Sequence, residues 1–198
     1  MTPVVRNIVI ACVAGFVLQN WAAPGLVVDL ALWPLHDLPV WPSFQPWQLV
    51  TYAFLHGDFM HLFLNMFALY MFGSSIEEVM GPRRFLAYYF VCVVSAAVAQ
   101  LIVQGVMGGA PRPTVGASGG VFGILLAYGL AFPHRKLMLI FPPIPMPAWL
   151  FVTLYGLLEL YMGIFARGSN VAHFAHLGGM AGGIVMILYW SRRRRRLM

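Results

Sequence analysis

A serine framed by glycines and a histidine that precedes two glycines are the groups in this chain best suited to do chemistry together. The serine lies in Gly116-Ala117-Ser118-Gly119-Gly120, and the histidine lies in Ala175-His176-Leu177-Gly178-Gly179. A serine hydroxyl is a weak nucleophile unless a neighbouring base takes its proton, and imidazole titrates near neutral pH. Both residues stand in strongly apolar surroundings, where a polar side chain is costly and is by default a functional hypothesis. We therefore predict that Ser118 and His176 form a nucleophile–base pair.

Three more polar residues lie earlier in the chain, at the start of another apolar run. They are His56, His61 and Asn65. His61 and Asn65 are four residues apart and would share one face of a helix. An imidazole and a carboxamide that point at one cavity could donate hydrogen bonds to an oxyanion, each worth about 3 kcal/mol in a transition state. We interpret His61 and Asn65 as oxyanion-stabilising residues and His56 as a supporting residue.

The composition indicates the environment of these groups. The chain has 198 residues, of which 61% are hydrophobic and 9% charged, with a mean hydropathy of +0.80. Soluble domains carry roughly 25% charged residues, so an integral membrane protein is expected. Cys12 and Cys92 both lie in apolar runs, which argues against a disulfide framework.

Apolar runs of about 20 residues predict membrane-spanning helices. We expect an all-α membrane protein, a single bundle of six transmembrane helices over residues 1–198. A large irregular outer loop over 29–55, rich in proline and tryptophan, would join the first two helices, and residues 141–147 would form a second break. The predicted spans are 6–28, 57–80, 84–106, 117–133, 147–166 and 171–191.

The basic residues orient these spans. With the N-terminus inside, ten of the twelve basic residues fall on the inner side, and only Arg112 and Arg167 fall outside. This agrees with the positive-inside rule and predicts that both termini are cytoplasmic. The basic tail, 192–198, with Arg192–Arg196 directly after an apolar helix, is expected to bind anionic lipid and not nucleic acid.

The three polar features fall at one depth in this arrangement. Asn65 lies 16 residues before Gly81, Ser118 lies 15 before Pro133, and His176 lies 16 before Arg192. Each group is then roughly 22–24 Å above the inner edge of a hydrocarbon core about 30 Å thick. Three different helices would therefore bring catalysis-capable groups to the same layer.

The fourth span also has features that suit hydrolysis. A helix that begins at Ser118 covers only about 22 Å, so irregular backbone before it must enter the membrane, which is tolerated beside protein or a water-filled cavity. Its N-terminus would present free N–H groups to an oxyanion. Small residues would let this span approach the sixth span closely; they are Gly119, Gly123 and Ala127 on one side, and Gly179 and Gly183, following His176, on the other.

Taken together, these motifs resemble the rhomboid family of intramembrane serine proteases. The resemblance covers about Trp47 to Tyr189 and includes His56, the His61–Asn65 pair, Glu77 with Gly81, the Gly116-x-Ser118-Gly119 motif, and His176 with Gly179 and Gly183. It implies a Ser118–His176 dyad without a third acidic member. It also implies an oxyanion site from the Ser118 N–H, His61 and Asn65, and cleavage of single-span membrane proteins near the outer end of their transmembrane segment.

The resemblance further implies that no metal or cofactor is needed. It suggests a minimal bacterial-type form without an extra domain or a seventh span, in the bacterial inner membrane. One departure is Gln48, where the family often has arginine after Trp47. That difference calls the anchoring of the outer loop into question, but not the chemistry.

Other classes of protein fit the sequence less well. A soluble α/β-hydrolase requires strands, and a zinc protease requires His-Glu-x-x-His, which does not occur. A transporter predicts paired broken helices in two related halves, which are not evident. A related protein that binds transmembrane helices without cutting them remains the main alternative, although such proteins usually lack the serine or the histidine.

Four further polar residues are expected to have roles other than catalysis. Glu159 is expected to be a structural partner or a protonated acid within the fifth span. His173 is expected to be an interfacial or neighbouring histidine. Glu77 and Glu78 are expected to be surface groups paired with nearby arginines.

Overall fold

The computed structural model describes residues 1–36, 39–107, 112–138, 143–166 and 171–195, with side chains up to Arg192. Parts of four sequence predictions lie outside what is described: residues 37–38 of the outer loop, the irregular stretch at 108–111, the second break at 141–142, and the side chains of the basic tail beyond Arg192. Arg167 lies outside the described residues as well. The long helices are α1 (Pro3–Val17), α4 (Phe59–Ala68), α6 (Pro82–Met107), α7 (Ser118–Ala131), α8 (Ala148–Phe165) and α9 (His173–Arg195).

Shorter elements extend or connect these helices. Two π-helical turns, η1 (Leu18–Ala22) and η3 (Leu69–Gly73), continue α1 and α4, and η3 leads into α5 (Ser74–Met80). The loop after η1 contains α2 (Leu26–Leu30), α3 (Gln48–Thr51) and a 3₁₀ turn, η2 (Tyr52–Phe54). A small antiparallel ladder joins β1 (Lys136–Met138) to β2 (Pro145–Pro147).

The prediction of an all-α membrane bundle is confirmed. Among the described residues, five helices are long and apolar enough to cross a membrane, and the sixth apolar helix, α7, is shorter, with 14 residues. The five long helices occupy Pro3–Ala22, Phe59–Met80, Pro82–Met107, Ala148–Phe165 and His173–Arg192.

The predicted end of the first span, residue 28, is wrong. The helix ends at Ala22, and α2 begins as a separate helix at Leu26. Pro24 and Gly25 lie between the two. Proline lacks the backbone N–H that a continuing helix needs, and it restricts the preceding residue to extended conformations.

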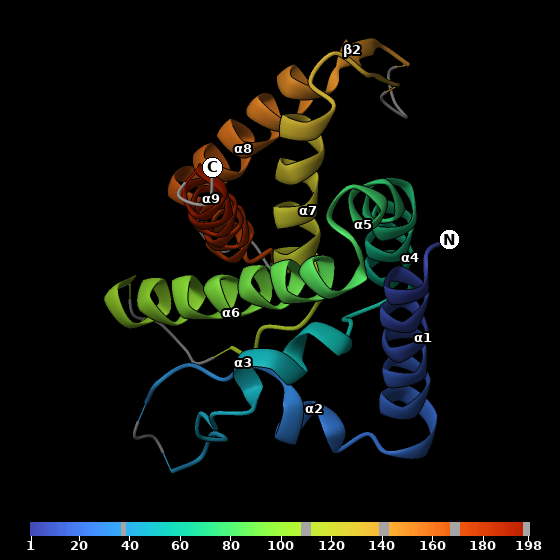
Figure 1. The fold of residues 1–198 in the computed structure, drawn as a ribbon. Coiled ribbons are helices and arrows are strands. Elements are labelled where there is room, and N and C mark those ends of the chain that lie inside the picture. Colours follow the sequence, from blue (N-terminus) through green and yellow to red (C-terminus); the bar gives the residue numbers. More distant parts are fainter. Residues whose placement is uncertain (37–38, 108–111, 139–142, 167–170, 196–198) are drawn as a thin grey trace.

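The short helix α7 lies in the middle of the bundle (Figure 1), where it packs against α6, α8 and α9. Every residue from Gly119 to Gly129 is buried, which fits a helix that is apolar on all sides. The surrounding helices instead expose apolar side chains, such as Leu157 and Tyr161 on α8. Such exposed apolar side chains suit contact with lipid.

Glycines set the distance between α7 and its neighbours. A methyl group added to Gly179 would overlap the carbonyl oxygen of Gly119, so the backbones of α7 and α9 touch directly. A methyl group at Gly123 would collide with Cys92 of α6. Gly183 differs from expectation, because a methyl group there would collide with Tyr88 of α6. The glycine face of α9 therefore serves two neighbours, α7 and α6.

The loop between α1 and α4 is anchored by a residue that the sequence left in doubt. Gln48 is buried, and its Oε1 accepts hydrogen bonds from the backbone N–H groups of Trp33 and Gln45, each at 3.2 Å. Its Nε2 donates to the carbonyl oxygen of Asp29 at 3.2 Å. The glutamine thus ties three loop segments together without an arginine.

The expectation that Glu77 is an ion-paired surface group is also wrong. Its side chain is only 3% exposed. The carboxylate accepts hydrogen bonds from the backbone N–H groups of Val4, at 3.1 Å, and Val5, at 2.9 Å, and from the Thr2 hydroxyl. It therefore caps the N-terminus of α1, where free N–H groups and the helix dipole favour a negative charge. Glu78 is exposed, as expected.

Replacing Gly179 with alanine should destabilise the fold, because the added methyl group has to push α7 and α9 apart. We expect Gly179→Ala to lower the free energy of unfolding by about 1–3 kcal/mol, the usual cost of overpacking. The measurement is unfolding in mixed detergent micelles.

The matched control is Gly105→Ala on α6, where an added methyl group meets nothing within 4 Å. That variant should be neutral or slightly stabilised, because alanine is the better helix former. Equal effects of the two substitutions would contradict the proposed close contact between α7 and α9.

Candidate active site

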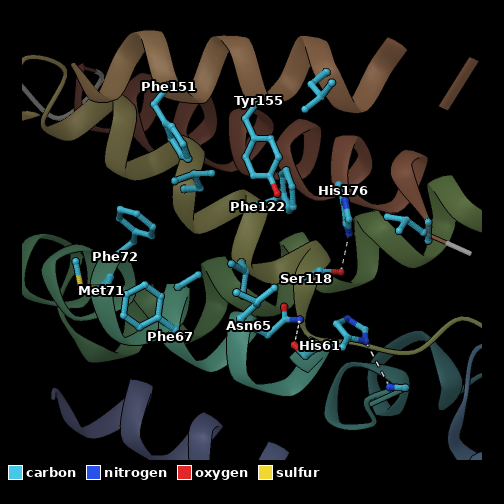
Figure 2. Close-up of a pocket in the computed structure, with 18 of the residues that line it drawn as sticks. His61, Asn65, Phe67, Met71, Phe72, Ser118, Phe122, Phe151, Tyr155 and His176 are labelled. Atoms are coloured by element: carbon cyan, nitrogen blue, oxygen red, sulfur yellow. Dashed lines mark hydrogen bonds between the residues drawn. The ribbon is translucent and has the colours of Figure 1, made fainter. Parts of the chain in front are cut away.

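The candidate site is centred on the contact between α7 and α9. His176 Nε2 lies 2.8 Å from Ser118 Oγ, within hydrogen-bond distance, so the proximity expected from the sequence is present (Figure 2). Ser118 is the first residue of α7, after the N-cap residue Ala117. The first N–H groups of a helix have no partner within it. The backbone next to the Ser118 hydroxyl can therefore donate hydrogen bonds to a negatively charged oxygen.

Two aromatic rings hold the imidazole of His176 in its plane. Phe122 lies one helical turn after Ser118 and stacks on the ring of His176, with centroids 4.2 Å apart and planes 7° apart. Tyr155 of α8 packs in turn against Phe122, with ring centroids 5.0 Å apart. The sequence prediction did not include Phe122. Its position four residues after Ser118, on the same helical face, is the signal that could have identified it.

His61 reaches the site from the first turn of α4. Asp58 caps this helix by accepting a hydrogen bond from the backbone N–H of His61 at 2.7 Å. The backbone N–H of Gly57 lies 3.4 Å from His61 Nδ1 and points at it. A neutral imidazole that accepts at Nδ1 carries its proton on Nε2, which leaves Nε2–H free to donate.

Gly116 makes room for this ring. It has a φ of +126°, a conformation that residues with a Cβ rarely adopt. A Cβ there would lie 2.7 Å from both Nε2 and Cε1 of His61. The glycine therefore allows the imidazole to lie directly against the backbone that leads into Ser118.

Asn65 is buried and lies in the same cavity (Figure 2). One hydrogen of its amide is used within α4, because Nδ2 donates to the carbonyl oxygen of His61 at 2.9 Å. The second hydrogen of that NH₂ group remains available to a ligand.

His56 adjoins the candidate site through its contact with His61. Its ring is fully buried and packs edge-on against His61, with centroids 5.2 Å apart. Burial lowers the pKa of His56 to about 4, with the neighbouring His61 as a smaller cause. The ring is therefore neutral between pH 5 and 8. Gln19 of the first span holds its backbone through two hydrogen bonds.

Glu159 and His173 both lie next to His176. One carboxylate oxygen of Glu159 lies 2.9 Å from His176 Nδ1 and 2.7 Å from His173 Nδ1. His173 is 8% exposed, and its ring centroid lies 6.4 Å from that of His176, so His173 is a neighbouring histidine, one of the two positions expected for it. The resemblance implied no acidic group beside the Ser118–His176 pair, and the structure places one there. The sequence did contain a signal for Glu159, because a lone carboxylate in an apolar helix is rare and suggests a function.

The same three residues form a cluster of potential ligand atoms. Among the described residues, one atom each from Glu159, His173 and His176 lie within 4.8 Å of one another, and such a set could hold a divalent metal ion. The two short nitrogen–oxygen distances are those of hydrogen bonds.

A cavity of about 1730 Å³ opens beside these residues. Ser118, His176, His61 and Asn65 line its polar end. Most of the other lining residues are apolar and come from α4 and η3 on one side and from α8 on the other (Figure 2); they include Phe67, Met71, Phe72, Phe151, Leu154 and Tyr155. Asp58, Gln100, Gln104, Arg112, Thr114 and Lys136 also line the cavity. The cavity therefore offers an apolar groove that leads to a small polar site.

The sequence of the chain is similar to those of several known proteins that have related names. The sequence family described as the Rhomboid domain matches residues 43–193. The chain is 30% identical to Rhomboid protein 1, mitochondrial, of Saccharomyces cerevisiae, over 87% of the chain and 55% of that protein. It is 30% identical to Rhomboid protease GluP of Bacillus subtilis, over 69% of the chain and 24% of that protein.

Rhomboid protease GlpG of Yersinia enterocolitica is 25% identical over 96% of the chain and 63% of that protein. The chain therefore spans less than two thirds of the length of each of these relatives.

Proposed function

Because the chain belongs to the rhomboid family, we propose that it is an intramembrane serine endopeptidase that hydrolyses peptide bonds in or near the transmembrane segments of membrane proteins. The observation that carries this proposal is the 2.8 Å contact between Ser118 Oγ and His176 Nε2. It lies at the N-terminus of a buried helix and at the polar end of an apolar cavity. Two relatives named as rhomboid proteases support it.

In the first chemical step, the Ser118 oxygen attacks the carbonyl carbon of the scissile peptide. Its proton passes to His176 Nε2 as the new C–O bond forms, and the carbonyl oxygen becomes an oxyanion. Phe122 supports this step by stacking on the imidazole, because a ring held in one plane keeps Nε2 aimed at the hydroxyl.

The oxyanion would be stabilised by donors from two helices. The backbone N–H of Ser118 comes from α7, and the side chains of His61 and Asn65 come from α4. The His61 Nε2–H and the second hydrogen of the Asn65 amide have the right protonation for this role. Such preorganised donors act strongly in a site of low dielectric constant.

The intermediate then collapses. The C–N bond breaks, and His176 returns the proton from Nε2 to the leaving nitrogen, which leaves an ester on Ser118. A water molecule attacks the carbonyl carbon of this ester while His176 Nε2 takes a proton from it. The C–O bond to Ser118 then breaks, His176 returns that proton to the serine oxygen, and the product leaves as a carboxylic acid. No step requires a metal ion or a cofactor.

The cavity suggests how the substrate arrives. Its apolar side lies between α4–η3 and α8, and α8 packs mainly against α7 and α9. A transmembrane segment has an apolar surface that fits such a groove. Once there, its backbone has to unwind locally before a carbonyl can reach Ser118, because helical peptide groups are hydrogen-bonded internally.

We also propose the orientation that the basic residues predict, with both termini on the cytoplasmic side, and the inner membrane of a bacterium as the location. The multi-pass membrane character is supported by five apolar helices of spanning length among the described residues. Relatives from Bacillus and Yersinia fit this location, whereas the yeast relative is mitochondrial. The arginines from Arg192 to Arg196 would bind anionic lipid.

Removing either member of the pair should abolish cleavage. We expect Ser118→Ala and His176→Ala to lose activity against a single-span substrate in proteoliposomes, and Ser118→Ala to lose labelling by a fluorophosphonate probe. Both variants should still unfold cooperatively, because each removes few atoms.

Matched controls are Ser191→Ala, whose hydroxyl donates to the carbonyl of Leu188 at the other end of α9, and His134→Ala in an exposed turn. Full activity of Ser118→Ala or His176→Ala would end the assignment of this pair. A wild-type chain that binds the substrate but is neither labelled nor active would support the non-cutting, helix-binding alternative.

The oxyanion donors should affect turnover more than binding. We expect Asn65→Ala and His61→Ala each to lower kcat by about 10- to 1000-fold, with little change in KM, because the charge develops only in the transition state. Asn20→Ala is the matched control, because Asn20 makes the same hydrogen bond, to the carbonyl oxygen of Phe16, away from the site. An unchanged kcat would remove the substituted residue from the oxyanion site.

A further inference from the structure

A single carboxylate joins the two histidines at the start of α9. Glu159 Oε2 lies 2.7 Å from His173 Nδ1 and 2.9 Å from His176 Nδ1. The carboxylate is on α8 and is 5% exposed. The contacts therefore form a continuous chain from His173 through Glu159 to His176, and from His176 Nε2 to the Ser118 hydroxyl at 2.8 Å.

The two ring nitrogens of His176 have different tasks. For Nε2 to take the proton from Ser118, it must carry a lone pair, so the proton of the neutral ring has to be on Nδ1. The alternative tautomer, with a proton on Nε2, would donate to the serine and could not act as its base. A carboxylate at 2.9 Å from Nδ1 accepts only and therefore selects the productive tautomer.

On this geometry we propose that Glu159 is a positioning residue for the reaction and converts the Ser118–His176 dyad into a serine–histidine–glutamate arrangement. This inference rests on the proposed function. Glu159 fixes the tautomer and rotation of the imidazole, and it stabilises the positive charge that His176 gains when it takes the serine proton. The carboxylate does not take up that proton itself, so the chemical steps are unchanged.

His173 has a supporting task in this arrangement. A carboxylate in an apolar helix is costly unless hydrogen-bond donors surround it. His173 lies one turn before His176 on the same helix and provides the shorter of the two contacts. His173 therefore holds the carboxylate of Glu159 against α9. In that position the same oxygen also contacts Nδ1 of His176, the ring that faces Ser118.

Two independent restraints on His176 support the proposal. The stacking of Phe122, with planes 7° apart, limits tilting of the ring. Stacking cannot distinguish a ring from the same ring flipped by 180°, which would exchange its nitrogen and carbon positions. The hydrogen bond to Glu159 makes that distinction, because only Nδ1 can donate to the carboxylate.

The test is Glu159→Gln, assayed with a chelator present throughout so that the nearby ligand atoms hold no stray metal ion. Glutamine keeps the shape, but it has no negative charge and can present an N–H to Nδ1, which favours the wrong tautomer. We expect kcat and the rate of fluorophosphonate labelling to fall by about 100- to 10,000-fold, with KM unchanged within about 2-fold.

Glu77→Gln is the matched control. Glu77 is another buried carboxylate, which caps α1 and does not line the cavity. Glu77→Gln should be less stable than the wild-type chain and have the same kcat. A wild-type kcat in Glu159→Gln would overturn the inference and leave the Ser118–His176 proposal intact. Absence of labelling in the wild-type chain would instead refute the proposed function.

A second measurement reads the protonation of His176 in the wild-type chain. Nitrogen-15 chemical shifts of His176, assigned by comparison with His176→Ala, report which ring nitrogen is protonated. We expect a protonated Nδ1 and an unprotonated Nε2 at the pH of the activity assay. A protonated Nε2 would overturn the inference even if Glu159→Gln fails to fold.

Discussion

The direct contact between the backbones of α7 and α9 is the constraint on which the rest of the site depends. Ser118 and His176 have short side chains, so their polar atoms meet at 2.8 Å only if the two helices are nearly touching. Gly179 allows this, because a side chain there would overlap the carbonyl oxygen of Gly119, and the missing side chain of Gly119 lets α6 approach α7 in the same region. In lipid, close packing of small residues replaces the hydrophobic effect as the force that brings helices together.

The proposed reaction needs both water and an apolar substrate at this contact. The short helix α7 begins at Ser118, and three residues of the loop just before it, Thr114, Gly116 and Ala117, are buried. Gly116 and Thr114 anchor that loop, through backbone hydrogen bonds with Tyr52 and Leu32 of the large outer loop. The apolar cavity opens instead between α4 and α8. A polar end beside an apolar groove suits a reaction that needs both water and a lipid-soluble segment.

Several buried polar residues support this arrangement, and they were the hardest to interpret from the sequence. Gln48 ties the outer loop together and Glu77 caps α1, although the first was considered a weakness and the second a surface group. The sequence predicts Glu159 as a structural partner or a protonated acid and His173 as an interfacial or neighbouring histidine. Each of these four residues has at least one partner on another element of the chain, and the pattern of a single helix contains no information about such partners.

The sequence alone determined the membrane bundle and most of its helices, and it predicts one level for Asn65, Ser118 and His176. It could do so because hydropathy marks a span and the rise per residue of a helix is constant. The tertiary structure alone decided which faces meet: Glu159 on His176, Phe122 on the same ring, and Gly183 on α6. The physical reason is that α7 is apolar on all sides, so periodicity assigns it no inner face, and the rotation of each helix is set by packing with its neighbours.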